Sequence, residues 1–161
     1  MKETYLAVAG RIRREVEEVE SVVERAQSIW EEVDPGTDPG GYRVDAVALN
    51  LHGFYAGLER IFETIARRVD QTVPEGAHWH QELLDQMNTE LSDVRPAVLS
   101  DESRKQLKRY RGFRHVVRNV YAFEFEPDQI DLLMKRLPDT TERVTNDLRS
   151  FATFLDEAAQ T

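Results

Sequence analysis

The chain contains no cysteine, which excludes disulfide bonds and zinc sites built on thiolates. It also lacks any apolar run near the roughly 18 residues that a membrane-spanning helix requires. Its first residues do not combine a basic start with an apolar stretch and a small-residue cleavage site, so we expect no secretory signal. These absences predict a cytoplasmic protein that does not enter a membrane.

Period-two alternation of apolar and polar residues, which marks a half-buried strand, is almost absent as well. The segment 94–99 comes nearest, and Pro96 interrupts it. Glycine-rich phosphate loops, nucleophile elbows and zinc-ligand spacings are also missing, so the sequence predicts neither a metal site nor a cofactor. With 161 residues, 40% of them apolar, the chain is long enough to bury a core, and we expect one domain over residues 1–161.

Apolar residues at alternating spacings of three and four, the pattern of amphipathic helices, run through most of the chain. They predict helices over about 4–33, 43–70, 77–90, 100–123 and 128–158. Ser100 is a suitable N-cap for the fourth helix, and Gly53 and Gly57 would let a neighbouring helix approach the second closely. Pro138 predicts a kink or a break in the last helix. The expected fold is all-α, an up-and-down bundle of four to five helices.

The charge is unevenly distributed along the sequence. The net charge is −9, yet one segment of the fourth predicted helix holds seven cations and no Asp or Glu. These cations are Arg104, Lys105, Lys108, Arg109, Arg111, Arg114 and Arg118. All 30 acidic residues lie elsewhere. A strongly basic helix in an otherwise acidic protein predicts a polyanionic ligand.

Arg114 occupies a position where the helical pattern calls for an apolar residue. The inward stripe of this helix is Leu107, Tyr110, Arg114, Val117 and Tyr121. A guanidinium on that stripe must be paired or line a cleft, because a buried unpaired charge costs several kcal/mol. Arg118 lies one turn further on, and His115 and Asn119 form a second pair one turn apart. From residue types alone, a solvated basic face with Arg114 in an internal ion pair remains the alternative.

This set of side chains suits the cleavage of a phosphodiester. Arginine forks bind phosphate oxygens and stabilise the charge of a pentavalent transition state, and an imidazole can move the proton of a ribose 2′-hydroxyl without a metal. Elsewhere, we interpret His78 and His80 as helix-start or packing residues, with a place for His80 at the cleft as the alternative. Glu59 is expected to face solvent or pair with an arginine, and Trp30 and Trp79 are expected in the core.

The segment 111–121 resembles the signature of the HEPN superfamily. That signature is an arginine and a polar residue, three or four further residues and then a histidine, and HepT-like members often add a tyrosine two positions later. Arg114, His115 and Tyr121 match these positions, while Asn119 stands where the histidine is expected. The stretches 49–62 and 79–87 and the order of the helices are also similar to the HepT-like class.

The resemblance implies a ribonuclease toxin of a HEPN/MNT toxin–antitoxin pair. Such proteins form homodimers through the motif helix and cut RNA without metal, leaving a cyclic phosphate. By that likeness Arg114 would hold the scissile phosphate, with Arg111, Arg118 and Lys108 as supporting RNA-binding cations. The implied partner is an MNT-type nucleotidyltransferase antitoxin, which would add AMP to Tyr121.

Asn119 departs from the family pattern, because a carboxamide has no titratable proton and cannot serve as a general acid or base. Three explanations stay open. The catalytic histidine was replaced to tolerate a toxic gene, the protein is a natural inactive or antitoxin-regulated variant, or His115 moves the proton from a shifted position. Two other functions also remain, a non-catalytic HEPN module that binds RNA or nucleotides, and a helical adaptor whose cations only form ion pairs.

Overall fold

The computed structural model describes residues 1–33, 38–119 and 125–161, apart from the side chains of Pro39, His115, Arg118 and Asn119. Its α-helices are α1 (Lys2–Glu31), α2 (Tyr42–Ile65), α3 (Trp79–Met87), α4 (Asp101–Asn119) and α5 (Pro127–Ala159). A 3₁₀ turn precedes α2 (Pro39–Gly41), and a π-helical turn continues it (Ala66–Asp70). Within the described residues the only β pairing is an isolated bridge between Leu91 and Arg95. The all-α prediction is therefore confirmed.

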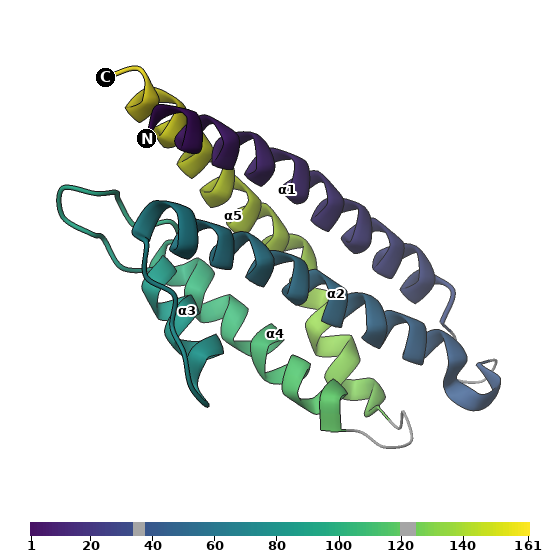
Figure 1. The fold of residues 1–161 in the computed structure, drawn as a ribbon. Helices are drawn as coiled ribbons and strands as arrows, with labels where there is room; N and C mark the ends of the chain where they lie inside the picture. The colour runs from purple at the N-terminus through teal and green to yellow at the C-terminus, as the bar shows by residue number, and fades with distance from the viewer. Residues whose placement is uncertain (34–37, 120–124) are drawn as a thin grey trace.

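Four long helices form the bundle, and each runs antiparallel to the one before it. In Figure 1 the chain goes down α1, back along α2, down α4 and back along α5, so both termini lie at the same end. α1 packs along α2 and α5, and α4 also packs against α2 and α5, which closes the four helices into a ring. The short α3 lies outside this ring against α2 and α4. This is the predicted up-and-down path.

The core is built from the predicted apolar stripes. In α1 the buried stripe is Ile12, Val16, Val19, Val23 and Ala26. Tyr55, Phe62 and Tyr110 fill the centre from α2 and α4, together with Phe113, which the predicted stripe of α4 had left out. Trp30 and Trp79 are only partly buried at the edge of the core, so the expectation that both belong to it is met in part.

Two glycines of α2 face α1, as predicted. A Cβ atom placed on Gly57 would lie 3.0 Å from Cγ2 of Val19, and one on Gly53 would lie 3.9 Å from Cγ1 of Val22. Only the first of these is tighter than ordinary van der Waals contact. The close approach of the two helices therefore depends on Gly57 more than on Gly53.

The start of α4 has the predicted cap and a further tie to α5. The backbone N–H of Ser103 donates to Oγ of Ser100 at 3.1 Å, which confirms Ser100 as the N-cap. The carboxylate of Asp147 in α5 accepts hydrogen bonds from the Ser100 N–H at 3.0 Å and the Ser103 hydroxyl at 2.6 Å. These contacts fix where α4 begins. Its predicted end near Phe123 falls outside the described residues.

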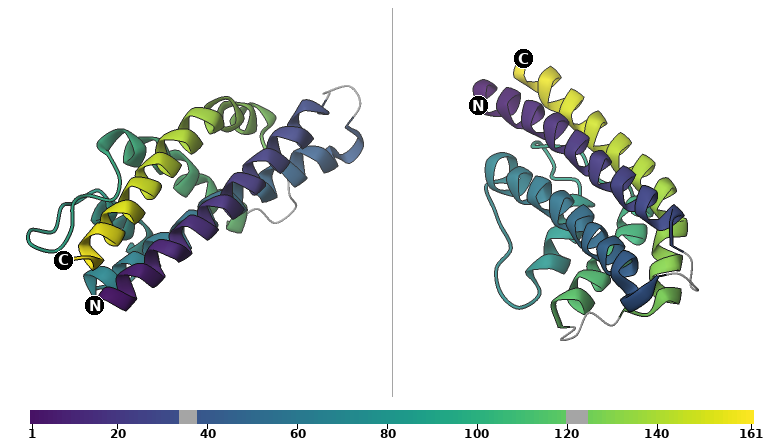
Figure 2. Two further views of the ribbon diagram at one scale, coloured as in Figure 1. Left: turned by 90° about the horizontal axis from the view of Figure 1, so that it is seen from above. Right: turned by 90° about the vertical axis from the view of Figure 1, so that its right-hand side faces the viewer.

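Of the predicted kink or break at Pro138, the structure shows no break, because α5 runs through this residue as one helix. A proline cannot donate to the carbonyl four residues earlier, so one helical hydrogen bond is missing there. Leu137 and Thr141 on either side are buried, and their packing holds the helix together. The left view of Figure 2 shows that the green N-terminal part of α5 bends away from the line of the rest, which agrees with the predicted kink.

A buried ion pair that the sequence did not signal holds the segment between α3 and α4. Both side chains of the pair, Arg95 and Asp70, are fully buried. The guanidinium donates to the Asp70 carboxylate at 2.6 and 2.8 Å, and to the carbonyl oxygens of Thr89, Pro96 and Gln86. Asp70 ends the π turn that follows α2. The pair therefore ties α2 to both ends of the connection that carries α3, and it fixes the position of that short helix.

Candidate functional site

Three helices meet at Arg114, the residue predicted to be paired or to line a cleft. Its Nη1 lies 2.9 Å from Nε2 of His80 at the start of α3. On the other side of that imidazole, Nδ1 of His80 lies 2.7 Å from Oε2 of Glu59 in α2. The guanidinium also forms a longer ion pair with Glu59, with 3.8 Å between Nε and Oε1. Glu59, His80 and Arg114 therefore form one connected cluster, which we call the α2–α3–α4 cluster.

The contact with Glu59 orients the imidazole of His80. A carboxylate oxygen accepts, so the contact at 2.7 Å places a ring proton on Nδ1, which is donated to Glu59. Nη1 of Arg114 lies 2.9 Å from Nε2 and 3.5 Å from Nδ1, so the guanidinium nitrogen sits over the imidazole ring. Nε2 is therefore the ring nitrogen that Glu59 does not hold. A carboxylate that holds an imidazole by Nδ1–H fixes its orientation and stabilises the imidazolium once a proton is taken up.

Burial divides the cluster into an inner and an outer part. Glu59 is buried in the helix packing, with 4% of its surface exposed. The side chains of His80 and Arg114 keep 21% and 18% of their surface exposed, so both reach solvent. The indole of Trp79 lies against the imidazole, with ring centroids 3.5 Å apart. The carboxylate is therefore an inner anchor, and the imidazole and guanidinium form the outer, accessible edge.

Buried donors beside the cluster lack acceptors. Tyr55 Oη, Arg111 Nη1 and Arg114 Nε are buried without a hydrogen-bond partner among the described residues. Burial raises the pKa of the Tyr55 hydroxyl, and the Glu59 carboxylate raises it further, whereas Arg111 and Arg114 lower it. Tyr55 is thus a neutral donor close to both arginines. Unpaired buried donors are rare in native proteins, so these three atoms mark a polar region inside the helix packing.

The other predicted cations of α4 divide into paired and open ones. Arg104 forms an ion pair with Asp85 in α3, at 2.6 Å between Nη2 and the carboxylate. Lys108 is exposed and forms no ion pair with a described residue. Lys108, Arg111 and Arg114 follow one another at intervals of three, so they lie along one side of the helix. A row of cations thus leads along α4 to the cluster.

The last turn of α4 carries the remaining motif residues. His115, Arg118 and Asn119 belong to the helix, but their side chains lie outside the description, and Tyr121 is outside the described residues altogether. Their roles in proton transfer, RNA binding and modification therefore stay predictions. In the described parts of the chain, no group of three or more His, Asp or Glu side chains could hold a metal ion. Nor does any described helix have the length and apolarity needed to cross a membrane.

Two residues of the cluster, Glu59 and His80, were ambiguous from the sequence, and Tyr55 beside the cluster was missed. Of the two expectations for Glu59, facing solvent or pairing with an arginine, the structure shows the second, in a buried position. His80 contacts Arg114, which favours its placement at the cleft over simple packing. Tyr55 looked like an ordinary member of the apolar stripe of α2. The available signal was that Glu59 lies one turn after Tyr55 on this buried face.

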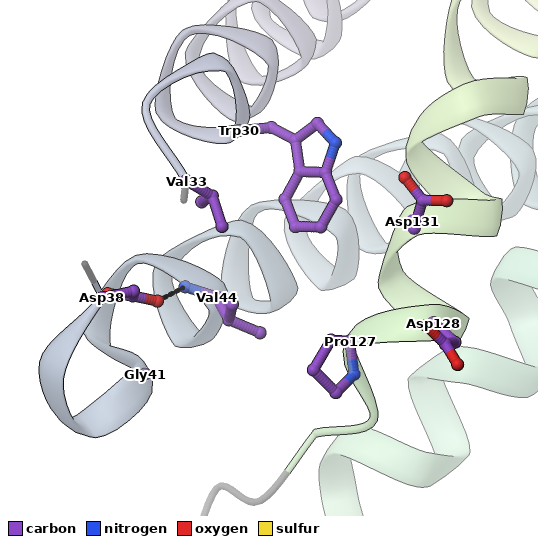
Figure 3. Close-up of a pocket in the computed structure, with 8 residues that line it drawn as sticks. All are labelled: Trp30, Val33, Asp38, Gly41, Val44, Pro127, Asp128 and Asp131. Carbon is purple, nitrogen blue, oxygen red and sulfur yellow. Dashed lines mark hydrogen bonds between the residues drawn. The ribbon is translucent and has the colours of Figure 1, made fainter. Parts of the chain in front are cut away.

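A pocket at the other end of α2 has the opposite electrostatic character (Figure 3). It encloses about 510 Å³ between the end of α1 and the starts of α2 and α5. Its lining residues are Trp30, Val33, Asp38, Gly41, Val44, Pro127, Asp128 and Asp131. Asp38 is engaged in accepting the backbone N–H groups of Arg43 and Val44 at 3.1 and 3.3 Å. The lining holds three carboxylates and no cation, so this pocket does not suit a polyanion.

Comparison with known proteins gives one match. A family model described as "HepT-like protein" matches residues 46–155, which is about two thirds of the chain. The matched range extends from the first turns of α2 almost to the end of α5, and it contains the whole α2–α3–α4 cluster. No curated protein and no solved structure matches the chain significantly.

Proposed function

Because the chain belongs to the HepT-like family, we propose that it is the toxin of a HEPN/MNT toxin–antitoxin pair and cleaves RNA without metal. The observation that carries this proposal is the state of Arg114. A guanidinium of the motif helix is held at the edge of a polar cluster, with 18% of its side-chain surface exposed. Its exposed edge is positioned to receive an anionic oxygen.

In the proposed reaction Arg114 binds the scissile phosphate and stabilises the charge that builds up on its oxygens. The ribose 2′-oxygen loses its proton, attacks phosphorus and displaces the 5′-oxygen, which leaves a cyclic phosphate. Arginine is suited to this role because its fork of donors matches two phosphate oxygens at once. Lys108 and Arg111 lead along α4 toward this point, and they and Arg118 would bind neighbouring phosphates of the strand.

We also propose that the protein forms a homodimer through the motif helix and that an MNT-type nucleotidyltransferase antitoxin adds AMP to Tyr121. Both parts rest on the family. A nucleotide added seven residues after Arg114 would bring negative charge to the basic segment and would compete with RNA. The acidic remainder of the chain offers a surface for the partner protein.

Two observations favour non-catalytic alternatives. Asn119 occupies the position of the family histidine, which favours an RNA-binding module that does not cut. The contacts of Arg114 with Glu59 and His80 also suit a helical adaptor in which this arginine only stabilises the fold. The two alternatives and the enzyme differ in what the Arg114→Ala substitution changes.

The test is RNA cleavage in EDTA by the parent chain and by Asn119→His, each with and without Arg114→Ala. Arg109→Ala is the matched control, because Arg109 is an exposed cation of the same helix that takes no part in the cluster. We expect cleavage that Arg114→Ala abolishes and Arg109→Ala leaves within about threefold. Salt-dependent RNA binding without cleavage by either parent would identify the binding module. A loss of stability with neither binding nor cleavage affected would identify the adaptor.

A further inference from the structure

The described part of the site contains an imidazole that the motif does not include. The proposed reaction needs a group that takes the proton of the 2′-hydroxyl, and Asn119 has no titratable proton for it. We propose that His80 of α3 is this general base and that Glu59 positions it. The inference rests on the proposed ribonuclease function and adds a second helix to its catalytic site.

The contacts place the basic nitrogen of His80 at the phosphate-binding arginine. Nε2 is 2.9 Å from Nη1 of Arg114. A phosphate bound by that guanidinium, or the ribose attached to it, would therefore lie next to the imidazole. Nδ1–H is fixed on Glu59 at 2.7 Å, which leaves Nε2 as the nitrogen able to accept a proton. The exposed edge of His80 allows substrate to reach it, while Glu59 remains inside.

The surroundings of His80 suit a base that gains positive charge. The charged groups it contacts are Glu59 from α2 and Arg114 from α4. The Glu59 carboxylate, held against Nδ1–H, would stabilise the imidazolium that forms when Nε2 takes up the proton. A phosphate bound by Arg114 would bring the neighbouring 2′-hydroxyl to the exposed side of this imidazole.

The reaction moves a phosphoryl group from the 5′-oxygen to the 2′-oxygen within the RNA, and nothing is oxidised or reduced. Nε2 of His80 takes the 2′-hydroxyl proton, the O2′–P bond forms, and the P–O5′ bond breaks with its electron pair on O5′. The leaving oxygen takes a proton from water, and the imidazolium returns its proton to solvent. These two proton transfers cancel, so neither water nor any other reactant is consumed overall.

A purely structural link between Arg114 and Glu59 would not need His80. In that case the guanidinium would donate directly to the carboxylate, as Arg95 does to Asp70 at 2.6 and 2.8 Å. Instead Arg114 Nε stays 3.8 Å from Glu59 and makes no hydrogen bond to a described residue, and the imidazole is inserted between Nη1 and the carboxylate. The cluster thus keeps an imidazole where an ion pair alone would have sufficed.

The experiment compares single-turnover cleavage of a short single-stranded RNA in EDTA, across pH, by the parent chain and by His80→Gln. Glutamine preserves a hydrogen-bonding side chain, and circular dichroism checks the fold. The matched control is His78→Gln, because His78 is exposed at the N-cap of α3 and makes no contact with the cluster. We expect the cleavage rate of His80→Gln to fall at least about 100-fold. The decrease in rate toward acid pH, seen in the parent, should be absent from this variant, while its RNA affinity stays within about threefold. His78→Gln should match the parent.

If His80→Gln folds poorly, the same rate and affinity measurements on Glu59→Gln test the proposal. As a positioning residue, Glu59 should affect the single-turnover rate by about tenfold and shift the acid limb of the profile, with little change in RNA affinity. Retention of the rate and of the acid limb in His80→Gln would overturn the proposal. So would cleavage by Asn119→His and none by the parent, which would leave the ribonuclease function standing. If neither protein cleaves RNA, the proposed function itself fails and the base assignment with it.

Discussion

Replacing Arg95 by methionine removes one partner of the buried ion pair and leaves Asp70 in place. Both side chains are fully buried, and Arg95 makes two hydrogen bonds to the carboxylate and three to backbone carbonyl oxygens. Breaking a buried pair from one side costs about 3–5 kcal/mol, because the remaining charge stays desolvated. Gln86 still donates to Asp70 at 2.7 Å, which keeps part of the carboxylate satisfied. We therefore expect a loss of about 3–4 kcal/mol in the free energy of unfolding.

The assay is equilibrium urea unfolding, followed by circular dichroism, of the parent and of Arg95→Met. The midpoint should fall while the slope with denaturant stays the same. Arg104→Met is the matched control, because Arg104 pairs with Asp85 at the surface, with side chains 30% and 41% exposed. An exposed pair of this kind contributes at most about 1 kcal/mol. A loss below about 1 kcal/mol for Arg95→Met, equal to that of the control, would refute the reasoning from burial.

Three further stability predictions follow from single contacts and use the same unfolding assay. Gly53→Ala should stabilise the protein by about 1 kcal/mol through helix propensity. Gly57→Ala should give a smaller gain in stability, because its Cβ would meet Val19 at 3.0 Å. Equal gains from the two variants would contradict the close packing of α1 and α2. Ser100→Ala should cost about 1 kcal/mol through loss of the N-cap, and no loss would show that the cap is unimportant. Burial raises the pKa of Tyr110 to about 12, so above pH 10 the unfolded chain ionises first and stability falls by up to about 3 kcal/mol as the pH rises toward 12. Tyr110→Phe should lose less stability over that interval, and an unchanged alkaline slope would count against this assignment.

The helices were predictable because each depends on residues close together in the sequence. Three-four spacing located α1, α2, α4 and α5, and Ser100 marked the start of α4 through a cap only three residues long. Pro138 left open a kink or a break, and α5 stays one helix because packing of both halves in the core offsets the local cost of a missing hydrogen bond. α3 came out shorter than predicted, beginning at Trp79 and ending at Met87, because local pattern defines helix ends poorly.

The site was predictable only on the helix that carries the motif. Arg114 stood out because a cation interrupted an apolar stripe, and that argument needs no partner. Its partners lie 34 residues away at His80 and, through that imidazole, a further 21 residues away at Glu59. The rotation of α3 about its axis, which turns His80 toward α4, depends on how the α2–α4 connection is held. That connection is fixed by Asp70 and Arg95, 25 residues apart, and no periodicity reveals such a pair.

The most direct test of the central claim, that an arginine-centred site cleaves RNA without metal, is the mass of the cleavage product. A short RNA incubated with the protein in EDTA should yield a 5′ fragment that ends in a 2′,3′-cyclic phosphate. Arg114→Ala should yield none, and Arg109→Ala should give the same product as the parent. A fragment ending in a 3′-hydroxyl, cleavage that requires added metal, or the same product from Arg114→Ala would contradict the account.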